Sequence, residues 1–387
     1  MDARAYRPED LICDRYLRDQ SAGEVASRNE RAILRQIWRR PGLQRSDLVN
    51  GIGLTQQSIH RIVDQLESRH LIALGPPVPG TGRGKPSPTI RLNPGWGLSA
   101  GISLETDSAG VTVMDVSGRY RTRRIDLDDV GRLAGLRRMD QALEEVLAEF
   151  NATRDDLFGI GFGITGFRVG GTRFNPPVPL EDWALIDLGP LLYEFFGVPV
   201  WVENGANCSA LAEATLGLGR RVADFAYLSF NYGFGGAVIS DGALLRGFRG
   251  NAGEFSAILD IEDNERRPAL GILLREMRAQ GVEIKSIAEL RQTFDPSWPG
   301  VDAWVDAALP CFNRVVNALS AIVDPEVIVL GGQIPRALAK TFVAGAEFWS
   351  EPRFGVERQV PRIEISELDD EPSSIGSSTL PIASCLL

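Results

Sequence analysis

The chain has 387 residues and a formal net charge of −10, and 44% of its residues are hydrophobic. This length and composition predict a folded protein of two or three domains. No apolar run is long enough to cross a bilayer and the first twenty residues are charged, so neither a membrane-spanning chain nor a signal peptide is expected. The four cysteines lack paired spacing, which argues against a disulfide framework or a cysteine zinc site and favours a reducing cytoplasm.

The charge is distributed unevenly along the chain. Between residues 28 and 95, eleven basic residues stand against four acidic ones, which gives this segment +7 and leaves −17 for the rest. A basic module on an acidic body indicates that phosphate contact is confined to one domain. We therefore expect residues 1–95 to form a DNA-binding domain with an N-terminal extension, and double-stranded operator DNA to be its partner.

The basic segment has the pattern of a helix-turn-helix. Apolar residues at helical spacing predict a helix over residues 28–40, which Pro41-Gly42 ends. A short helix over 45–50 and a glycine turn precede Thr55, a suitable N-cap for a third helix. Recognition helices reach base edges with the residues of their N-terminal half. The residues exposed there are Gln56, Gln57, Ser58, His60 and Arg61.

Two short apolar runs, over residues 71–74 and 89–92, flank a loop rich in proline and glycine and predict a wing. The tip of this loop carries Arg83 and Lys85, and Arg83 is placed to enter a minor groove. The alternative interpretation is a solvated pair of basic helices followed by a flexible linker.

The body of the chain reads as α/β. An apolar strand over residues 198–202 delivers Glu203, Asn204 and Asn207 at its carboxyl end, where open α/β sheets bind ligands. A second polar cluster, at 251–254, follows a glycine-rich hairpin. Two such clusters predict a small polar ligand held between two lobes. We expect a first lobe over residues 96–208, completed by about 366–387, and a second lobe over 209–365.

Three motifs in this body resemble the ROK family of repressors and sugar kinases. They are Val-Glu-Asn-Gly-Ala-Asn at 202–207, Ala-Gly-Glu at 252–254 and Val-Ile-Val-Leu-Gly-Gly at 327–332. The resemblance covers nearly the whole chain from about residue 28. It implies a winged helix-turn-helix ahead of a two-lobed, actin-like (ribonuclease-H-like) sugar-kinase fold, as in regulators of the xylose/N-acetylglucosamine repressor type.

The resemblance also implies an effector site. Asn204, Glu254 and, on a gap-free alignment, Glu276 match sugar-binding positions of the family, and Gly166 lies in a loop that resembles the family's Pro-Gly loop. Trp183 would stack on a sugar face, unless it only packs in the core. Asn204 has an alternative role too, because an asparagine can satisfy backbone groups in a tight turn, and Glu276 can equally be a solvated helix charge.

The departures from the family pattern concern the catalytic base, the phosphate loop and the family's structural zinc. The position of the family's general base is Gly205, which has no side chain to accept a proton. The expected phosphate loop, at 102–107, lacks paired glycines and contributes Glu105 and Asp107 instead. The three zinc cysteines are absent from 267–276, and no histidine follows His70.

We therefore expect a sugar-responsive transcriptional regulator, of the repressor kind, whose kinase-like domain is catalytically inactive. It would use no cofactor and no metal, act in the cytoplasm and form a homodimer or a higher oligomer, because paired half-sites suit a two-fold protein. Two alternatives stay open: a constitutive DNA-binding regulator with a vestigial cleft, and an active ATP-dependent sugar kinase.

Overall fold

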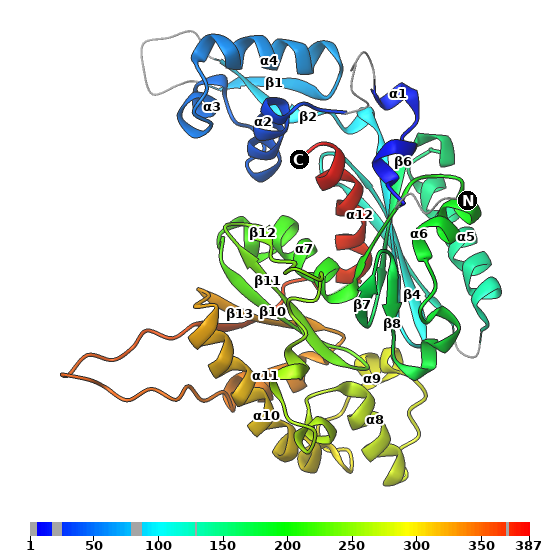
Figure 1. Cartoon of the computed structure of the whole chain (residues 1–387), viewed down its shortest axis with the longest axis vertical. Helices are drawn as coiled ribbons and strands as arrows, with labels where there is room; N and C mark the ends of the chain where they lie inside the picture. The colour runs from blue at the N-terminus through cyan, green and yellow to red at the C-terminus, as the bar shows by residue number, and fades with distance from the viewer. Residues whose placement is uncertain (1–5, 18–24, 79–86, 128–129, 369–370) are drawn as a thin grey trace.

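The structure is a computed structural model that describes residues 6–17, 25–78, 87–127, 130–368 and 371–387. A small N-terminal module lies above two α/β lobes, and a C-terminal helix runs between the module and the lobes (Figure 1). Among the helices in these ranges, none combines the length and the apolarity that crossing a membrane requires.

The N-terminal module is a winged helix-turn-helix, as expected. Thr55 Oγ1 accepts a hydrogen bond from the Ser58 amide at 3.2 Å and so caps the third helix. The apolar face of that helix, from Ile59 to Leu66, is almost completely buried. Two antiparallel strands follow and pair Ile72 with Leu92. The elements are α2 (Arg28–Arg39), α3 (Arg45–Gly51), α4 (Gln56–Ser68), β1 (Ile72–Val78) and β2 (Ser87–Leu92).

The first lobe is built on a five-stranded sheet with the order β5-β4-β3-β6-β9. Every residue of β3, β4 and β6 is buried, because helices cover these strands on both faces. The strands are β3 (Leu98–Leu104), β4 (Ser108–Asp115), β5 (Tyr120–Asp126), β6 (Leu157–Ile164) and β9 (Val200–Asn204), with helices α5 (Arg132–Glu149) and α6 (Leu188–Phe196). A hairpin of β7 (Phe167–Gly170) and β8 (Arg173–Asn175) and a 3-10 helix (Val178–Trp183) extend the lobe towards the cleft.

The second lobe is built on a sheet with the order β12-β11-β10-β13-β14. Its strands are β10 (Phe225–Phe230), β11 (Phe234–Ser240), β12 (Ala243–Leu244), β13 (Val327–Gly332) and β14 (Arg362–Ile365). Its helices are α7 (Gly205–Leu216), α8 (Leu270–Ala279), α9 (Ile287–Thr293), α10 (Val301–Ile322) and α11 (Arg336–Ala344). Helix α10 continues through Pro310 rather than restarting there.

The C-terminal helix α12 (Pro372–Cys385) packs against α7, β3 and β6. The approach is so close that a β-carbon on Gly376 would lie 1.6 Å from the Cys208 carbonyl oxygen, and one on Gly161 would lie 1.8 Å from that of Ser377. Only glycine permits such contact between backbones. At its far end α12 meets the N-terminal module, where Arg31 Nη1 donates to the Ser384 carbonyl at 2.6 Å. The helix thus lies against the sheet of the first lobe, and its end forms one apolar cluster with α2.

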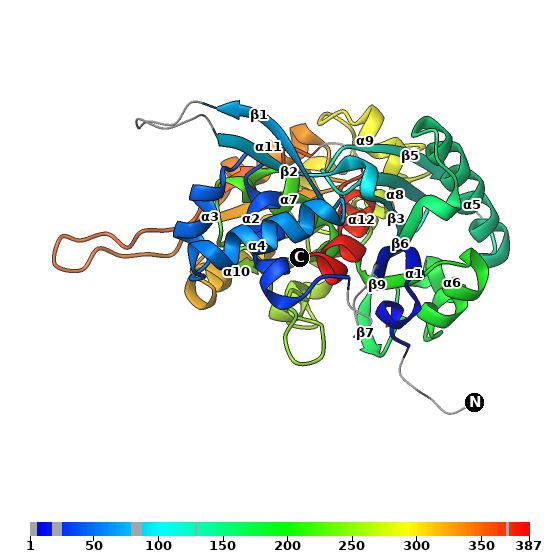
Figure 2. The same ribbon diagram turned by 90° about the horizontal axis from the view of Figure 1, so that it is seen from above.

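The N-terminal segment, to which the sequence patterns assign no role, fastens the module to the first lobe. It holds a 3-10 turn (Pro8–Leu11) and α1 (Asp14–Leu17). The Tyr6 hydroxyl accepts from the Val200 amide at 2.8 Å, and the Tyr16 hydroxyl donates to the Asp156 carbonyl at 2.8 Å. The Tyr16 ring also packs on Trp96 and Phe158. Seen from above, the module covers α7 and α12 (Figure 2).

Candidate functional site

Helix α4 presents its N-terminal half to solvent. Gln56, Gln57 and Arg61 are exposed, and within the described part of the chain their side chains form no hydrogen bond or ion pair. Ser58 and His60 are half-buried, and the Ser58 hydroxyl accepts a hydrogen bond from Thr55 Oγ1 at 2.9 Å. The two glutamines and the arginine thus carry free amide and guanidinium groups, of the kind that bond adenine and guanine edges. Arg83 and Lys85 lie outside the described residues.

The turn between β9 and α7 contains Asn204, and its amide is largely used within the fold. Its Oδ1 accepts from the amides of Ala206 at 2.8 Å and Asn207 at 3.2 Å, so it caps α7. Its Nδ2 donates to the Gly166 carbonyl at 2.9 Å. Gly166 has φ +107° and no room for a β-carbon, which would lie 2.4 Å from the Asn175 carbonyl oxygen. One amide N–H of Asn204 remains for a ligand.

A buried carboxylate lies beside this turn. Glu203 at the end of β9 is paired with Arg168 of β7 at 3.2 Å and with Arg246 of the second lobe at 3.1 Å. Burial opposes its charge, but the two arginines and hydrogen bonds from Asn204 and Asn207 hold the pKa of Glu203 below its ordinary value. Arg168, Glu203 and Arg246 therefore join the two lobes as an ionic triad.

The sequence motifs do not reveal this triad. Glu203 is part of the motif that matches the ROK family, but its partners are 35 and 43 residues away along the chain. Arg168 also lies over the Phe174 ring at 4.7 Å. The only signal in the sequence is an acidic residue followed by a capping asparagine at the end of a strand, which indicates that the carboxylate has a buried partner. Nothing in this pattern identifies which arginine is that partner.

The remaining predicted effector residues lie on the second lobe. Glu254 is half-buried, and burial raises the pKa of its carboxyl. Glu276 lies on α8, where its side chain is 47% exposed and paired with Arg275 at 3.7 Å. Within the described residues no hydrogen bond connects Glu254 or Glu276 with the turn of Gly166 and Asn204, whereas the latter two are bonded directly.

A cavity between the lobes lies apart from these four residues. Its volume is about 860 Å³. Neither Gly166 nor Asn204, Glu254 or Glu276 lines it. The first lobe contributes Leu104–Asp107, Leu127, Val130, Gly131, Gly135 and Val178–Trp183, and the second lobe contributes Tyr232, Leu274, Arg278 and Ile284–Ile287. Trp183 borders the cavity but is only 4% exposed and stacks on Phe162, so packing is its role in this state.

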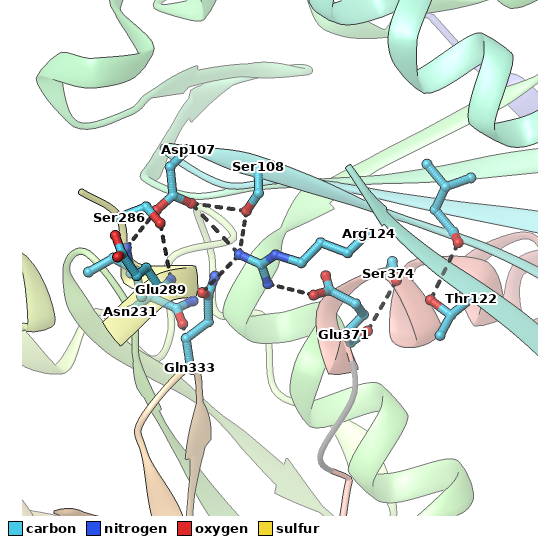
Figure 3. Close-up of polar contacts among 12 residues, drawn as sticks. Asp107, Ser108, Thr122, Arg124, Asn231, Ser286, Glu289, Gln333, Glu371 and Ser374 are labelled. Atoms are coloured by element: carbon cyan, nitrogen blue, oxygen red, sulfur yellow. Dashed lines mark hydrogen bonds and ion pairs between the residues drawn. The ribbon is translucent and has the colours of Figure 1, made fainter. Parts of the chain in front are cut away.

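A polar cluster at the back of this cavity occupies the position of the expected phosphate loop (Figure 3). Arg124 of β5 donates to Glu371 at 2.6 Å, to the Ser108 hydroxyl at 2.6 Å and, across the cleft, to Gln333 at 3.3 Å. Asp107 accepts from the Ile287 amide of the second lobe at 2.7 Å. These bonds connect the lobes at a second point, besides the triad of Glu203.

Electrostatics make this cluster unsuitable for phosphate. Glu105 is 7% exposed, and burial together with the nearby charges of Glu371 and Asp107 raises its pKa to about 8. One arginine, Arg124, thus stands among three carboxyl groups. Phosphate sites instead use backbone N–H groups and unpaired cations, whereas Arg124 is already paired with Glu371 and Asp107.

Comparisons with known proteins agree with this architecture. A family model described as ROK family matches residues 134–265. The xylose repressor of Caldicellulosiruptor bescii is 23% identical over 400 residues, which cover 92% of this chain and 96% of that protein. The glucokinase of Halalkalibacterium halodurans is 33% identical over 241 residues, which cover 55% of this chain and 73% of that protein.

Among solved structures, a ROK family transcriptional regulator, described as a homologue of the E. coli Mlc protein, matches with a TM-score of 0.61. The match has 18% sequence identity and covers 92% of this chain and 96% of that chain. It supports the fold of the module and of both lobes together. The α/β fold with two actin-like sheets is therefore as expected from the sequence motifs.

Proposed function

This chain belongs to the ROK family, and from that premise we propose that it is a DNA-binding transcriptional regulator, of the repressor kind, and not a sugar kinase. The repressor relative is similar along almost the whole chain, including the N-terminal module, whereas the glucokinase is similar along 55% of it. The regulator acts on double-stranded operator DNA, and the scattered cysteines favour the cytoplasm.

The observation that carries the proposal is the free N-terminal half of α4. Gln56, Gln57 and Arg61 are exposed on a helix whose opposite face is fully packed and whose N-terminus is capped. They belong to a segment with a net charge of +7 on an otherwise acidic protein. A helix of this kind enters the major groove, while the basic residues around it neutralise phosphates. Arg83 and Lys85 are proposed to extend the contact from the wing.

The proposal that the chain does not phosphorylate rests on two sites. Gly205 stands where the base would be. A β-carbon there would lie 3.3 Å from the Ser373 hydroxyl oxygen and 3.8 Å from the Ile164 carbonyl, so a small shift of the Ser373 side chain would admit it. The phosphate side holds Glu105, Asp107 and Glu371 around Arg124. The similarity to glucokinase favours a kinase as the second candidate, and sugar-dependent ATP turnover would establish it.

We further propose that a sugar or sugar derivative binds between the lobes, with Gly166, Asn204, Glu254 and Glu276 as its contacts on the two sides. Binding would change the angle between the lobes and, through α12, the position of the module. Coupling between two sites of this kind commonly amounts to about 1–3 kcal/mol, which changes affinity several-fold to a hundred-fold. Two modules in a dimer would then fit or miss paired half-sites.

The test of DNA binding uses the full chain and sheared genomic DNA, from which bound fragments are recovered and sequenced. We expect a discrete sequence to be enriched, and Gln56→Ala together with Arg61→Ala to abolish the enrichment. Gln65→Ala is the matched control, because Gln65 is exposed on the same helix about two turns further on. Equal recovery of all fragments by the unaltered protein would refute the regulator.

The test of the effector is a thermal-shift screen with sugars and sugar phosphates, with and without Mg-ATP. A ligand at a hundred times its dissociation constant stabilises the folded state by about 2.7 kcal/mol. We expect one sugar to raise the unfolding temperature equally with and without ATP. This shift should disappear in Glu254→Ala and persist in Glu194→Ala, the control at an exposed position. No hit would favour the constitutive regulator with a vestigial cleft, and a hit that needs ATP would favour the kinase.

A further inference from the structure

The second lobe carries a long projection that the proposed DNA-binding and effector sites do not use. Residues 346–361, which we call the arm, connect α11 with β14 and extend away from the body (Figure 1, Figure 2). Ten consecutive residues, 351–360, are exposed. A loop that serves only to connect two elements is usually short and lies on the surface, so an arm of this length has another use.

The root of the arm is fixed to α10. Asn313 donates to the Gly345 carbonyl at 3.1 Å and accepts from the Glu347 amide at 3.0 Å. One helical turn later, Asn317 donates to the Glu347 carbonyl at 2.8 Å and accepts from the Trp349 amide at 2.7 Å. On the returning strand, Arg358 donates to the Ser320 carbonyl. Three residues on one helix thus hold both strands of the arm in a defined direction.

The tip of the arm is a tight turn with an aromatic side chain. The amide and carbonyl groups of Arg353 and Val356 bond each other reciprocally, both at 3.0 Å. Phe354 and Gly355 between them have φ +54° and +74°, the left-handed pair of a hairpin turn. A bulky residue rarely adopts this conformation, and here it places a phenylalanine that is 98% exposed at the far end of the arm.

The arm therefore exposes a strip of large apolar side chains. Trp349 is 64% exposed, Phe354 98% and Val356 70%. Ile322, two residues after the Ser320 that accepts from Arg358, is 81% exposed at the end of α10. Clustered exposed aromatic and branched side chains mark protein interaction surfaces.

The charges on the arm indicate what covers it. Between residues 346 and 361 there are three acidic and two basic residues, and from Glu351 to Arg358 the two signs alternate along the chain. Within the described residues, Glu351, Arg353 and Glu357 have no ion pair. A nearly neutral strip is unlike the basic footprint that nucleic acid requires. A strip with both signs is complementary to a second copy of itself, in which the order of charges is reversed by a two-fold axis.

We propose that the arm is a dimerisation element: the arm and the end of α10 of one chain pack against the same surface of a second copy. Trp349, Phe354 and Val356 would form the apolar centre, and Glu351, Arg353 and Glu357 would pair across the axis. A stable interface needs about 800 Å² from each partner, and a tryptophan and a phenylalanine alone supply about 150–250 Å² each. The proposal does not depend on DNA or effector binding.

The first experiment measures the mass of the full chain by analytical ultracentrifugation at micromolar concentration. One chain has a mass of 42.2 kDa, and we expect twice this value. Replacing Phe354 and Val356 with serine should weaken the dimer about tenfold or more, which corresponds to about 1.4 kcal/mol. Phe248→Ser is the matched control, because Phe248 is also 98% exposed but lies outside the arm. Unfolding midpoints confirm that each variant is folded.

A charge exchange tests the two-fold pairing. Arg353→Glu in one chain, and Glu351→Arg with Glu357→Arg in another, should each weaken self-association. A mixture of the two variants should form heterodimers, because each arm then meets opposite charges. A monomeric unaltered chain, a dimer that keeps its affinity without Phe354 and Val356, or a mixture that does not associate would each overturn the proposal.

Discussion

Asn251 of the second lobe and the backbone of Arg168 in the first lobe bind each other twice. Asn251 Oδ1 accepts from the Arg168 amide at 2.7 Å, and its Nδ2 donates to the Arg168 carbonyl at 2.8 Å. Arg246 of the second lobe also pairs with Glu203 of the first, so the polar groups beside the expected sugar position already hold the lobes together. A ligand that enters there has to compete with this contact, so Asn251 sets how readily the lobes separate.

Asn251→Ala should lower the free energy of unfolding by about 1–2 kcal/mol, since it removes two hydrogen bonds between partly buried groups. Urea denaturation of the full chain measures the change. Asn264→Ala is the matched control, because Asn264 is exposed and its side chain forms no hydrogen bond within the described residues. Equal losses in the two variants would mean that the contact with Arg168 contributes nothing.

Glu105→Gln should change how stability depends on pH. In the folded chain the pKa of Glu105 is raised to about 8 from an ordinary value of 4.5, by burial and by Glu371 and Asp107. Between these values the folded state keeps a proton that the unfolded state releases. The free energy of unfolding therefore falls as pH rises through this window, by up to about 1.4 kcal/mol per pH unit. The contribution is complete below about pH 4.5 and is lost above about pH 8.

Glutamine does not titrate, so the variant should lose less stability than the unaltered chain between about pH 5 and pH 8. Urea denaturation at several pH values gives both curves, and their difference cancels the titration of other groups. Glu194→Gln, an exposed carboxyl, should leave the curve unchanged. Parallel curves for Glu105→Gln and the unaltered chain would show that Glu105 is ionised in the folded state.

Arg124→Met should destabilise the fold by about 3 kcal/mol, because it leaves the carboxyls of Glu371 and Asp107 buried without their cation. The side chain of Arg124 is only 20% exposed. Arg121→Met, on the same strand, is the control: its side chain is 59% exposed and pairs with Glu149 at 4.0 Å. An exposed pair contributes at most about 1 kcal/mol, and thermal denaturation separates the two cases.

Gly205→Asp should not create a sugar kinase. The new β-carbon at the start of α7 would lie 3.3 Å from the Ser373 hydroxyl oxygen, which a small shift of that side chain relieves, and an aspartate would restore a base at the family position. The phosphate side would still lack glycines at 102–107, and Arg124 would still be paired with Glu371 and Asp107 rather than free for the phosphates of ATP. We expect no sugar-dependent ADP release above background from either the unaltered chain or this variant. Turnover by the variant alone would mean that the missing base was the whole defect.

The sequence was sufficient for the elements that local patterns determine. Thr55, the apolar face of α4 and the paired runs around Ile72 and Leu92 follow from capping and periodicity, and the structure confirms them. The contacts of Glu203 do not follow in this way, because a buried carboxylate has no signature that identifies distant arginines. The same holds for Tyr6 and Tyr16, whose partners in the first lobe are set by the tertiary fold.

The site was predicted with less success. The sugar-binding interpretation of Asn204 competed with a turn-stabilising one, and in this state the turn uses three of its four hydrogen-bonding positions. Glu276 was placed by alignment alone. A shift of one residue in that alignment moves a position from the buried to the exposed face of α8, so the exposure of its side chain does not follow from the sequence. The contacts that Gly166, Asn204, Glu254 and Glu276 make with an effector remain predictions.

The close packing of α12 limits which substitutions this protein can accept. Glycine at 161 and 376 lets the backbones touch. Any other residue at either position would push α12 away from β6 or α7. The helix meets the cluster of Arg124 and Glu371 at one end and the DNA-binding module at the other. Substitutions can therefore change the surfaces at both ends, and with them the effector and the operator that the protein would recognise. Helix α12 between these surfaces has to keep its glycine contacts.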